Sequence, residues 1–493
     1  MLESFDLAAL LSLALALPAL GALGLIAAGR WPNVREAVTL LTATALFACV
    51  WQLLSFVQAG FSQQLVLIEV LPQLTLALSL EPLGMLFALV ASGLWIVNSL
   101  YSIGYMRGNQ ESHQTRFYVC FALALSSAMG VAFAANVFTL FFFYELLTLV
   151  TYPLVIHHGT EAARQGGRVY MLTLLGSSTV LLLPALVLTW FIAGTTDFSP
   201  GGILDAAPFD FSLGLLLALY MFGIGKAALM PLHGWLPAAM VAPTPVSALL
   251  HAVAVVKAGV FCVIKVVVYV FGVDLLALHA STDWLVAVAG FTIIAASIIA
   301  LGADNLKRRL AYSTVSQLSY VVLATALLVP LSLVGAVVHV AAHALGKITL
   351  FFAAGAIYTA SHKTQVSQLD GIGRRMPWTM GAFAVGALSM IGLPPAVGFI
   401  SKWYMLSGAM EAQRWAAVAV IVISTLLNAA YFLPIVYRAF LKAPATTDSA
   451  HAHGEAPWPM VVALTLTAAA TVLLFFMPDV PLQLARWMLQ GAY

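Results

Sequence analysis

Apolar segments long enough to cross a lipid bilayer recur along the entire 493-residue chain. A helix needs about 20 consecutive apolar residues to span the hydrocarbon core of a membrane. Only 8% of the residues are charged, whereas about a quarter are charged in ordinary soluble domains. The sequence therefore predicts an all-α polytopic membrane protein with about 14 transmembrane helices. The predicted spans are 7–28, 36–58, 78–101, 117–135, 137–156, 168–193, 211–240, 245–271, 284–303, 308–328, 332–360, 377–410, 415–437 and 458–477.

Basic residues lie mostly on one side of the predicted membrane. If both termini are placed outside, the odd-numbered connections are cytoplasmic and hold fourteen of the 21 Lys and Arg residues. The opposite side keeps two, and five lie inside spans. Because basic connections tend to stay in the cytoplasm, we expect a multi-pass protein of a bacterial inner (cell) membrane with both termini on the outer side. The acidic N-terminus is expected to lead into the first span rather than to be a cleaved signal peptide.

Ionisable side chains within spans are the strongest functional signal. A charged group at membrane depth is costly and usually marks an ion path. The apolar stretch 225–265 holds Lys226, His251, Lys257 and Lys265. Lys257 lies at the centre of its span and is expected in the path. Lys265 lies nearer the outer end, so an anchoring role with its ammonium reaching the interface stands beside a role in transport.

Glu145 is a carboxylate predicted to lie well inside the fifth span. It follows Val137 by eight residues, a rise of about 12 Å along a helix. A lone acid hydrogen-bonded by Tyr144 or Thr148 is one interpretation. A basic partner is favoured because desolvation of an unpaired carboxylate is expensive, and Lys226 is the candidate.

Two spans, 211–240 and 377–410, are too long for one straight crossing and are predicted to be broken. Proline removes an amide donor and displaces the carbonyl one turn earlier. We expect the first break just after Lys226 and the second just ahead of Lys402. Their opposed directions predict inverted repeats formed by spans 4–8 and 9–13. The prolines of the two breaks are Pro231, Pro237, Pro394 and Pro395.

The inverted repeats define four predicted regions. They are N-terminal scaffold helices (1–116), a first five-helix repeat (117–271), a second five-helix repeat (284–440), and a cytoplasmic linker with the last helix (441–493).

The eleventh span carries His339, His343 and Lys347 at four-residue intervals. This spacing places all three on one stripe of a helix, roughly 12 Å long. One buried histidine is more often a satisfied core residue, but three ionisable groups on one stripe favour a proton wire. The complete predicted proton relay is Glu145, Lys226, His251, Lys257, His339, His343, Lys347 and Lys402.

No metal, disulfide or cofactor site is expected. The cysteines are scattered singly within spans without paired spacing, which is typical of small apolar fillers. His451, His453 and Glu455 are interpreted as part of a solvated linker rather than a metal site, since they supply only three ligands. No nucleotide, haem or flavin motif is present, so no catalytic chemistry of its own is expected. The cysteines are Cys49, Cys120 and Cys262.

Four motifs in order, PLHGWLP, APTPVSALLHA, HALGK and GLPPAVGFISK, carry a specific resemblance. Together they resemble the proton-conducting antiporter-like subunits of respiratory complex I and of Mrp-type cation/proton antiporters, and most closely the D-type subunit of the Mrp antiporters. The resemblance covers the whole chain. It implies an ion-pair carboxylate at Glu145, a broken-helix lysine at Lys226, a central relay group at Lys257 or Lys347, and an exit-side residue at Lys402.

The chain also departs from that pattern. Many family members have an acid and a histidine between the WLP and APTP segments, where this chain reads AAMV at 238–241. Lys402 stands where one complex I subunit has glutamate, which argues against that subunit. The long lateral helix of the largest members is not found after the last predicted span.

The resemblance implies a proton-translocating subunit of an Mrp-like multisubunit sodium/proton antiporter. One alternative is a proton-pumping subunit of complex I (NADH-quinone oxidoreductase) or a membrane hydrogenase. Another is an energy-coupling subunit of a bicarbonate-uptake system, which would have a large zinc-containing soluble partner. The expected partners are other membrane subunits, the lipid bilayer, protons and sodium, and no nucleic acid.

Overall fold

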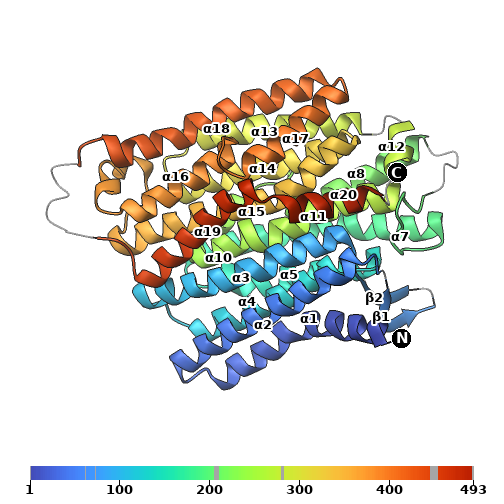
Figure 1. Ribbon diagram of the computed structural model, residues 1–493, viewed down its shortest axis with the longest axis horizontal. Helices are drawn as coiled ribbons and strands as arrows, with labels where there is room; N and C mark the ends of the chain where they lie inside the picture. The colour runs from blue at the N-terminus through green and yellow to red at the C-terminus, as the bar shows by residue number, and fades with distance from the viewer. Residues whose placement is uncertain are drawn as a thin grey trace.

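The computed structural model describes residues 2–61, 63–72, 74–204, 210–278, 282–444 and 454–490. Within these ranges the protein is a bundle of long helices that run in roughly a common direction (Figure 1). Among the described residues, ten helical segments are long and apolar enough to cross a membrane. They are Asp6–Ala27, Pro32–Gln58, Pro82–Gly108, Gln114–Ala132, Val137–Val155, Glu161–Ala193, Asp283–Gly302, Pro330–Ser361, Trp415–Leu441 and Trp458–Phe476. The predicted class, a polytopic helical membrane protein, is confirmed.

The long helices lie side by side in the bundle. In Figure 1, α1 and α2 lie at one edge, α18 lies at the opposite edge, and α15 runs through the middle. The two ends of the chain lie at the same end of the bundle. The bounds are α1 Leu2–Ala27, α2 Pro32–Gln58, α3 Pro82–Gly108, α4 Gln114–Ala132, α5 Val137–Val155, α6 Glu161–Ser177, α7 Leu183–Ala193, α13 Asp283–Gly302, α14 Leu306–Ala326, α15 Pro330–Ser361, α18 Trp415–Leu441, α19 Trp458–Phe476 and α20 Asp479–Gln490.

Four predicted spans are not among the ten long apolar segments. Spans 211–240, 245–271 and 377–410 are built from interrupted helices, and 308–328 corresponds to the more polar α14. The count of fourteen crossings therefore stays a prediction.

A β-hairpin lies between α2 and α3, where the all-α prediction placed only a connection. Strand β1 (Gln64–Leu71) pairs antiparallel with β2 (Leu74–Ser79). Most β1 side chains are exposed, so the strand lacks the alternation of buried and exposed residues that marks a strand in a sequence. Hydrogen bonds from Ala77 N to Thr139 Oγ1 (2.9 Å) and from Ser79 N to Phe133 O (2.7 Å) attach the hairpin to α4 and α5.

The first broken helix consists of α8 (Asp210–Gly223), a 3-10 turn at Gly225–Ala227 and the short α9 (Trp235–Ala238). The helix therefore ends before Lys226, and the prediction of a break just after this lysine is wrong. Ala228 has a left-handed backbone (φ 55°) and turns the chain well ahead of Pro231. Gly259 of α11 (Val255–Val266) permits this turn, because a Cβ there would lie 2.4 Å from Ala227 N.

The second broken helix consists of α16 (Pro377–Ile391) and α17 (Gly398–Glu411). Its break lies ahead of Lys402, as predicted. Gly392 ends α16 at φ 89°, a left-handed conformation that only glycine adopts readily. The Met230–Pro231 and Pro394–Pro395 peptide bonds are both cis.

The eighth predicted span is a series of helical pieces rather than one regular helix. It begins with α10 (Thr244–Ala248), passes through a π-turn at Leu249–Val253, continues as α11 and ends in a π-turn at Val267–Phe271 before the short α12 (Val273–Leu278). Single π-turns inside helices are frequent at functional sites. Lys257 lies on α11 between the two π-turns.

Candidate ion-conducting site

Lys226 lies in the first helix break and is completely buried. Its ammonium donates to Tyr144 O (2.7 Å) and to Thr148 Oγ1 (2.6 Å), and it lies 3.1 Å from the centroid of the Tyr144 ring. Its backbone amide donates to the Tyr144 hydroxyl (3.1 Å). The lysine is therefore held by one turn of α5, on either side of Glu145.

Glu145 does not form the expected ion pair in this structure. Among the described residues, neither carboxylate oxygen has a hydrogen-bonding partner, and both oxygens are buried. Tyr144 and Thr148, the alternative neutral partners, bind Lys226 instead. Desolvation of an unpaired carboxylate is costly, and Glu145 lies on α5 between the two residues that bind the Lys226 ammonium.

Lys257 lies next to the histidine stripe of α15. Its Nζ is 2.5 Å from Nδ1 of His343, and both residues are buried. The rings of His343 and His339 stack with centroids 5.8 Å apart. A lysine of one predicted repeat thus contacts a histidine pair of the other.

His339 continues the contact series toward the second helix break. Its Nδ1 is 2.8 Å from the hydroxyl of Ser401, the residue before Lys402. The Lys402 ammonium donates to Met390 O (2.9 Å) and Ile391 O (3.1 Å), the last carbonyls of α16. Cations are stabilised at this negative end of a helix.

Lys347 lies apart from this series, although it shares the predicted stripe with the histidines. Its ammonium donates to Leu310 O of α14 (3.2 Å) and lies 5.6 Å from the Phe432 ring centroid. No described hydrogen bond or ion pair joins Lys347 to Lys257 or Lys402, so any proton path through Lys347 needs intervening water.

Lys265 makes its contacts inside the protein. It is completely buried and forms an ion pair with Glu81, the residue before α3. The rings of Phe198 and Tyr269 lie 4.4 and 4.8 Å from its ammonium. Glu81 therefore holds the ammonium instead of solvent, and the choice between an anchoring role and a role in transport stays a prediction.

Two predictions concern side chains that lie partly outside the described residues. The side chain of His251 and the residues His451 and His453 lie outside the described residues. Glu455 is described, and its carboxylate accepts hydrogen bonds from Trp378 N (2.8 Å) and from the Thr379 hydroxyl (2.6 Å). It therefore caps the start of α16, a role that differs from a solvated linker residue.

The structure adds Ser401 as a residue that the sequence analysis did not single out. Ser401 lies within the GLPPAVGFISK motif, but a hydroxyl gives no hydropathy signal. One contact series leads from the interrupted eighth span to Lys402 in the second broken helix. Its members are Lys257, His343, His339 and Ser401. Lys226 is not joined to this series by any described hydrogen bond, although Gly259 of α11 packs on its backbone.

These features define a class: a polytopic membrane protein with a buried series of ionisable groups between two broken helices. The family described as NADH:quinone oxidoreductase/Mrp antiporter, transmembrane, matches residues 134–428. The chain belongs to this family.

Two relatives show how widely the sequence is shared. The chain is 36% identical over 377 residues to NADH-quinone oxidoreductase subunit N of Desulforudis audaxviator, covering 75% of this chain and 74% of the relative. It is 32% identical over 353 residues to a probable K(+)/H(+) antiporter subunit of Rhizobium meliloti. That match covers 70% of this chain but only 34% of the relative, which is a much longer protein.

A solved structure confirms the fold over nearly the full length. A chain in the structure of the Mrp complex from Dietzia sp. DQ12-45-1b superimposes with a TM-score of 0.83 at 22% identity. The superposition covers 98% of each chain. At this identity the match establishes the fold alone.

Proposed function

We propose that this protein is the proton-translocating membrane subunit of an Mrp-like multisubunit monovalent cation/proton antiporter, with sodium as the exchanged cation. The observation that carries the proposal is the buried series from Lys257 through His343, His339 and Ser401 to Lys402. Buried ionisable groups in contact at membrane depth are expensive, and proton transfer is their best-attested use.

The first helix break supplies the switch in this proposal. A nearby carboxylate stabilises a buried ammonium, whereas burial alone favours the neutral amine. Movement of Glu145 toward Lys226 would therefore retain a proton on the lysine, and movement away would release it. Water must bridge from Lys226 to Lys257, where the contact series begins.

Transport by the assembled complex in proteoliposomes tests this proposal. A cation gradient is imposed and proton movement is followed with a pH-sensitive dye. Lys226→Ala is expected to abolish transport while the complex still assembles. Full transport by this variant would refute the proposal.

A second candidate is the proton-pumping subunit of a complex I-type or hydrogenase-type respiratory complex. The identity to NADH-quinone oxidoreductase subunit N favours it. Both candidates use the same relay and differ in their partners. Identification of the subunits that copurify decides between them, since iron-sulfur and quinone-module subunits belong to the second candidate alone.

The proposed setting is a bacterial inner membrane with both termini on the outer side. The support is the concentration of basic residues in the odd-numbered connections and the location of both ends at one end of the bundle. The proposed partners are other membrane subunits, and we assign this chain to the D-type subunit on its motif pattern. Accessibility of cysteines introduced near the termini to an impermeant reagent tests the orientation.

A further inference from the structure

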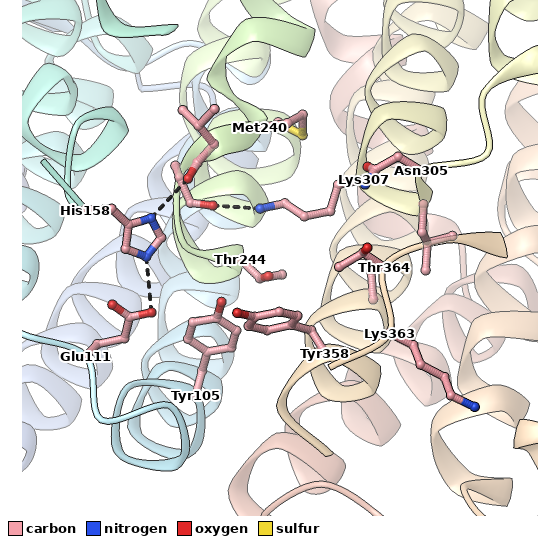
Figure 2. Close-up of a pocket in the computed structure, with 14 residues that line it drawn as sticks. Tyr105, Glu111, His158, Met240, Thr244, Asn305, Lys307, Tyr358, Lys363 and Thr364 are labelled. Atoms are coloured by element: carbon pink, nitrogen blue, oxygen red, sulfur yellow. Dashed lines mark hydrogen bonds and ion pairs between the residues drawn. The ribbon is translucent and has the colours of Figure 1, made fainter. Parts of the chain in front are cut away.

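A polar cavity of ≈ 240 Å³ lies at the end of the bundle away from the hairpin. It is enclosed by five connections: after α3, after α5, before α10, before α14 and after α15. Figure 2 shows the hydroxyls of Tyr105, Tyr358 and Thr244 grouped together, with Glu111 and His158 on one side and Lys307 on another. The cavity thus draws its polar groups from both predicted repeats.

Two side chains hold the connection that precedes α10. Nδ1 of His158 is 3.1 Å from Val241 O, and the Lys307 ammonium donates to Ala242 O at 2.6 Å. The other ring nitrogen of His158, Nε2, is 3.3 Å from Oε1 of Glu111 (Figure 2).

This geometry places His158 between the Val241 carbonyl and Glu111. A carbonyl oxygen only accepts, so Nδ1 of His158 is the donor in the contact with Val241 O. A protonated imidazole has a second N–H at Nε2, which then donates to Oε1 of Glu111. His158 can therefore take up a proton at Nε2 while Nδ1 stays bound to the carbonyl.

Polar groups continue from the cavity toward Lys257. Thr244 lines the cavity, and Ser247 lies one helical turn further along α10. The Ser247 hydroxyl and Oδ1 of Asn98 on α3 are buried without a protein partner among the described residues. Such atoms usually bind ordered water. The chain continues from Ser247 to Lys257 on α11, about 20 Å beyond Thr244 at the rise of a helix.

We propose that this cavity is the proton-loading site of the relay and that the His158–Glu111 pair takes up the proton from the cytoplasm. The inference rests on the proposed function and on the proposed orientation of the chain. It also accounts for the AAMV segment, which has no titratable side chain. Here the acid and the histidine come from neighbouring connections and contact the carbonyl of Val241 in that same segment.

The surrounding charges favour this pair. The hydrogen bond to Glu111 raises the pKa of His158 above its ordinary value of 6.5, although burial opposes the shift. A raised pKa keeps the imidazole protonated at pH values where an ordinary histidine has lost its proton. Burial lowers the pKa of the adjacent His157 to about 4, so His157 stays neutral near Glu111.

Other charged and titratable groups also face the pair. Nε2 of His157 is 3.8 Å from Oε2 of Glu111, and Arg116 of α4 donates to His157 O (3.0 Å). Across the cavity lie Tyr105, Tyr358, and the ammonium groups of Lys307 and Lys363. Glu111 is the one carboxylate among these groups.

The test measures transport by the assembled complex against pH on the cytoplasmic side. Glu111→Gln and His158→Gln are each expected to lower the pH of half-maximal transport by about one unit, which means about tenfold more protons for the same rate. Glu161→Gln and His113→Gln are matched controls, since both residues are exposed at the same end of the bundle. Their curves are expected to match the wild type.

A variant that restores the pH dependence distinguishes a role in proton loading from a simple loss of folding. Met240 lines the cavity (Figure 2). Met240→His in the His158→Gln background is expected to return the curve toward the wild-type pH. The pH of half-maximal transport does not depend on the amount of assembled complex.

Unchanged curves for Glu111→Gln and His158→Gln would overturn the loading site while leaving the proposed function intact, provided that Lys226→Ala still abolishes transport. Full transport by Lys226→Ala would instead overturn the proposed function. Failure of Met240→His to restore the curve would also count against the cavity as the loading site.

Discussion

The two helix breaks hold their lysines in different ways. Lys226 lies within its break and reaches sideways to α5, where it binds Tyr144 O and Thr148 Oγ1 next to Glu145. Lys402 lies one turn after its break and reaches back to the final carbonyls of its own broken helix, Met390 and Ile391. The first lysine is bound by neutral groups of a neighbouring helix beside a carboxylate, and the second is bound by a helix end.

Under the proposed function, this difference gives the two lysines different tasks. A carboxylate that approached or retreated would change the charge beside the ammonium of Lys226. The carbonyls at a helix end form a fixed partial charge, so Lys402 has a constant partner. Lys402 also borders a cavity of ≈ 280 Å³ lined by Trp403 and Leu426, whose side chains are exposed. Lys226 thus fits a switch and Lys402 a terminal group.

The largest effect is expected from removal of the moving charge. Glu145→Gln is predicted to reduce transport by on the order of 100-fold, because proton transfer by a positioned group contributes about 10²–10⁴-fold. Transport is measured in proteoliposomes that contain the assembled complex. Glu411→Gln, an exposed acid at the end of α17, is the control. If Glu145→Gln keeps more than half of the wild-type rate, Lys226 does not act as a switch driven by this carboxylate.

Substitution of a third buried lysine, Lys265, tests whether burial alone is enough to make a lysine part of the relay. Lys265→Met is expected to destabilise the protein by about 1–3 kcal/mol, since it leaves Glu81, a partly buried carboxylate, without its counter-charge. The double variant Lys265→Met/Glu81→Leu should recover most of this loss. Thermal unfolding of the purified complex measures both effects. Transport per assembled complex should stay close to wild type, and a loss as large as that of Glu145→Gln would place Lys265 in the relay.

The sequence predicted the broken helices and the lysines beside them because proline and charge are visible in one dimension. The sequence could not predict the contact between Lys257 and His343. The two residues are 86 positions apart, and only the packing of α11 against α15 brings them together. The contacts of Lys226 with Tyr144 O and Thr148 Oγ1 were hidden for a related reason. They depend on where the chain turns after Gly223, and Pro231 indicated a later turn.

The hairpin and the cavity show a second limit of prediction from the sequence. The exposed side chains of β1 give no period that separates a strand from a connection. Glu111 and His158 lie in short connections, where charged residues are ordinary, so their sequence carries no sign of the contact between them. Membrane depth was readable for Lys226 and Lys402 because apolar residues surround them on both sides.

The two breaks should also respond differently to added bulk. A Cβ at Gly259 would lie 2.4 Å from Ala227 N and from the Lys226 carbonyl carbon, both backbone atoms that cannot give way. Gly259→Ala is therefore expected to cost about 1–3 kcal/mol, in the range of an overpacked core, and to reduce transport by displacing Lys226. Gly381→Ala in α16, where a Cβ meets nothing within 4 Å, is the control.

At the second break, a Cβ on Gly392 would lie 2.7 Å from Cδ of Lys402, a flexible side chain. Gly392→Ala should also destabilise the protein, through its φ of 89°, by about 1–3 kcal/mol. Its transport loss should be smaller than that of Gly259→Ala at equal amounts of assembled complex. Equal transport losses would show that the two lysines are equally dependent on the backbone of their breaks.

The smallest effect on transport is expected from substitution of Ser401, which links His339 to Lys402. Ser401→Ala removes the hydroxyl that lies 2.8 Å from Nδ1 of His339 but leaves the bonds of Lys402 to Met390 O and Ile391 O in place. Loss of one such hydrogen bond is worth about 0.5–1.5 kcal/mol, so transport should fall by roughly two- to tenfold. Ser401→Thr keeps the hydroxyl and should retain more of the rate than Ser401→Ala. If alanine and threonine behave alike, the proton reaches Lys402 through water rather than along this hydroxyl, and the contact series ends at His339.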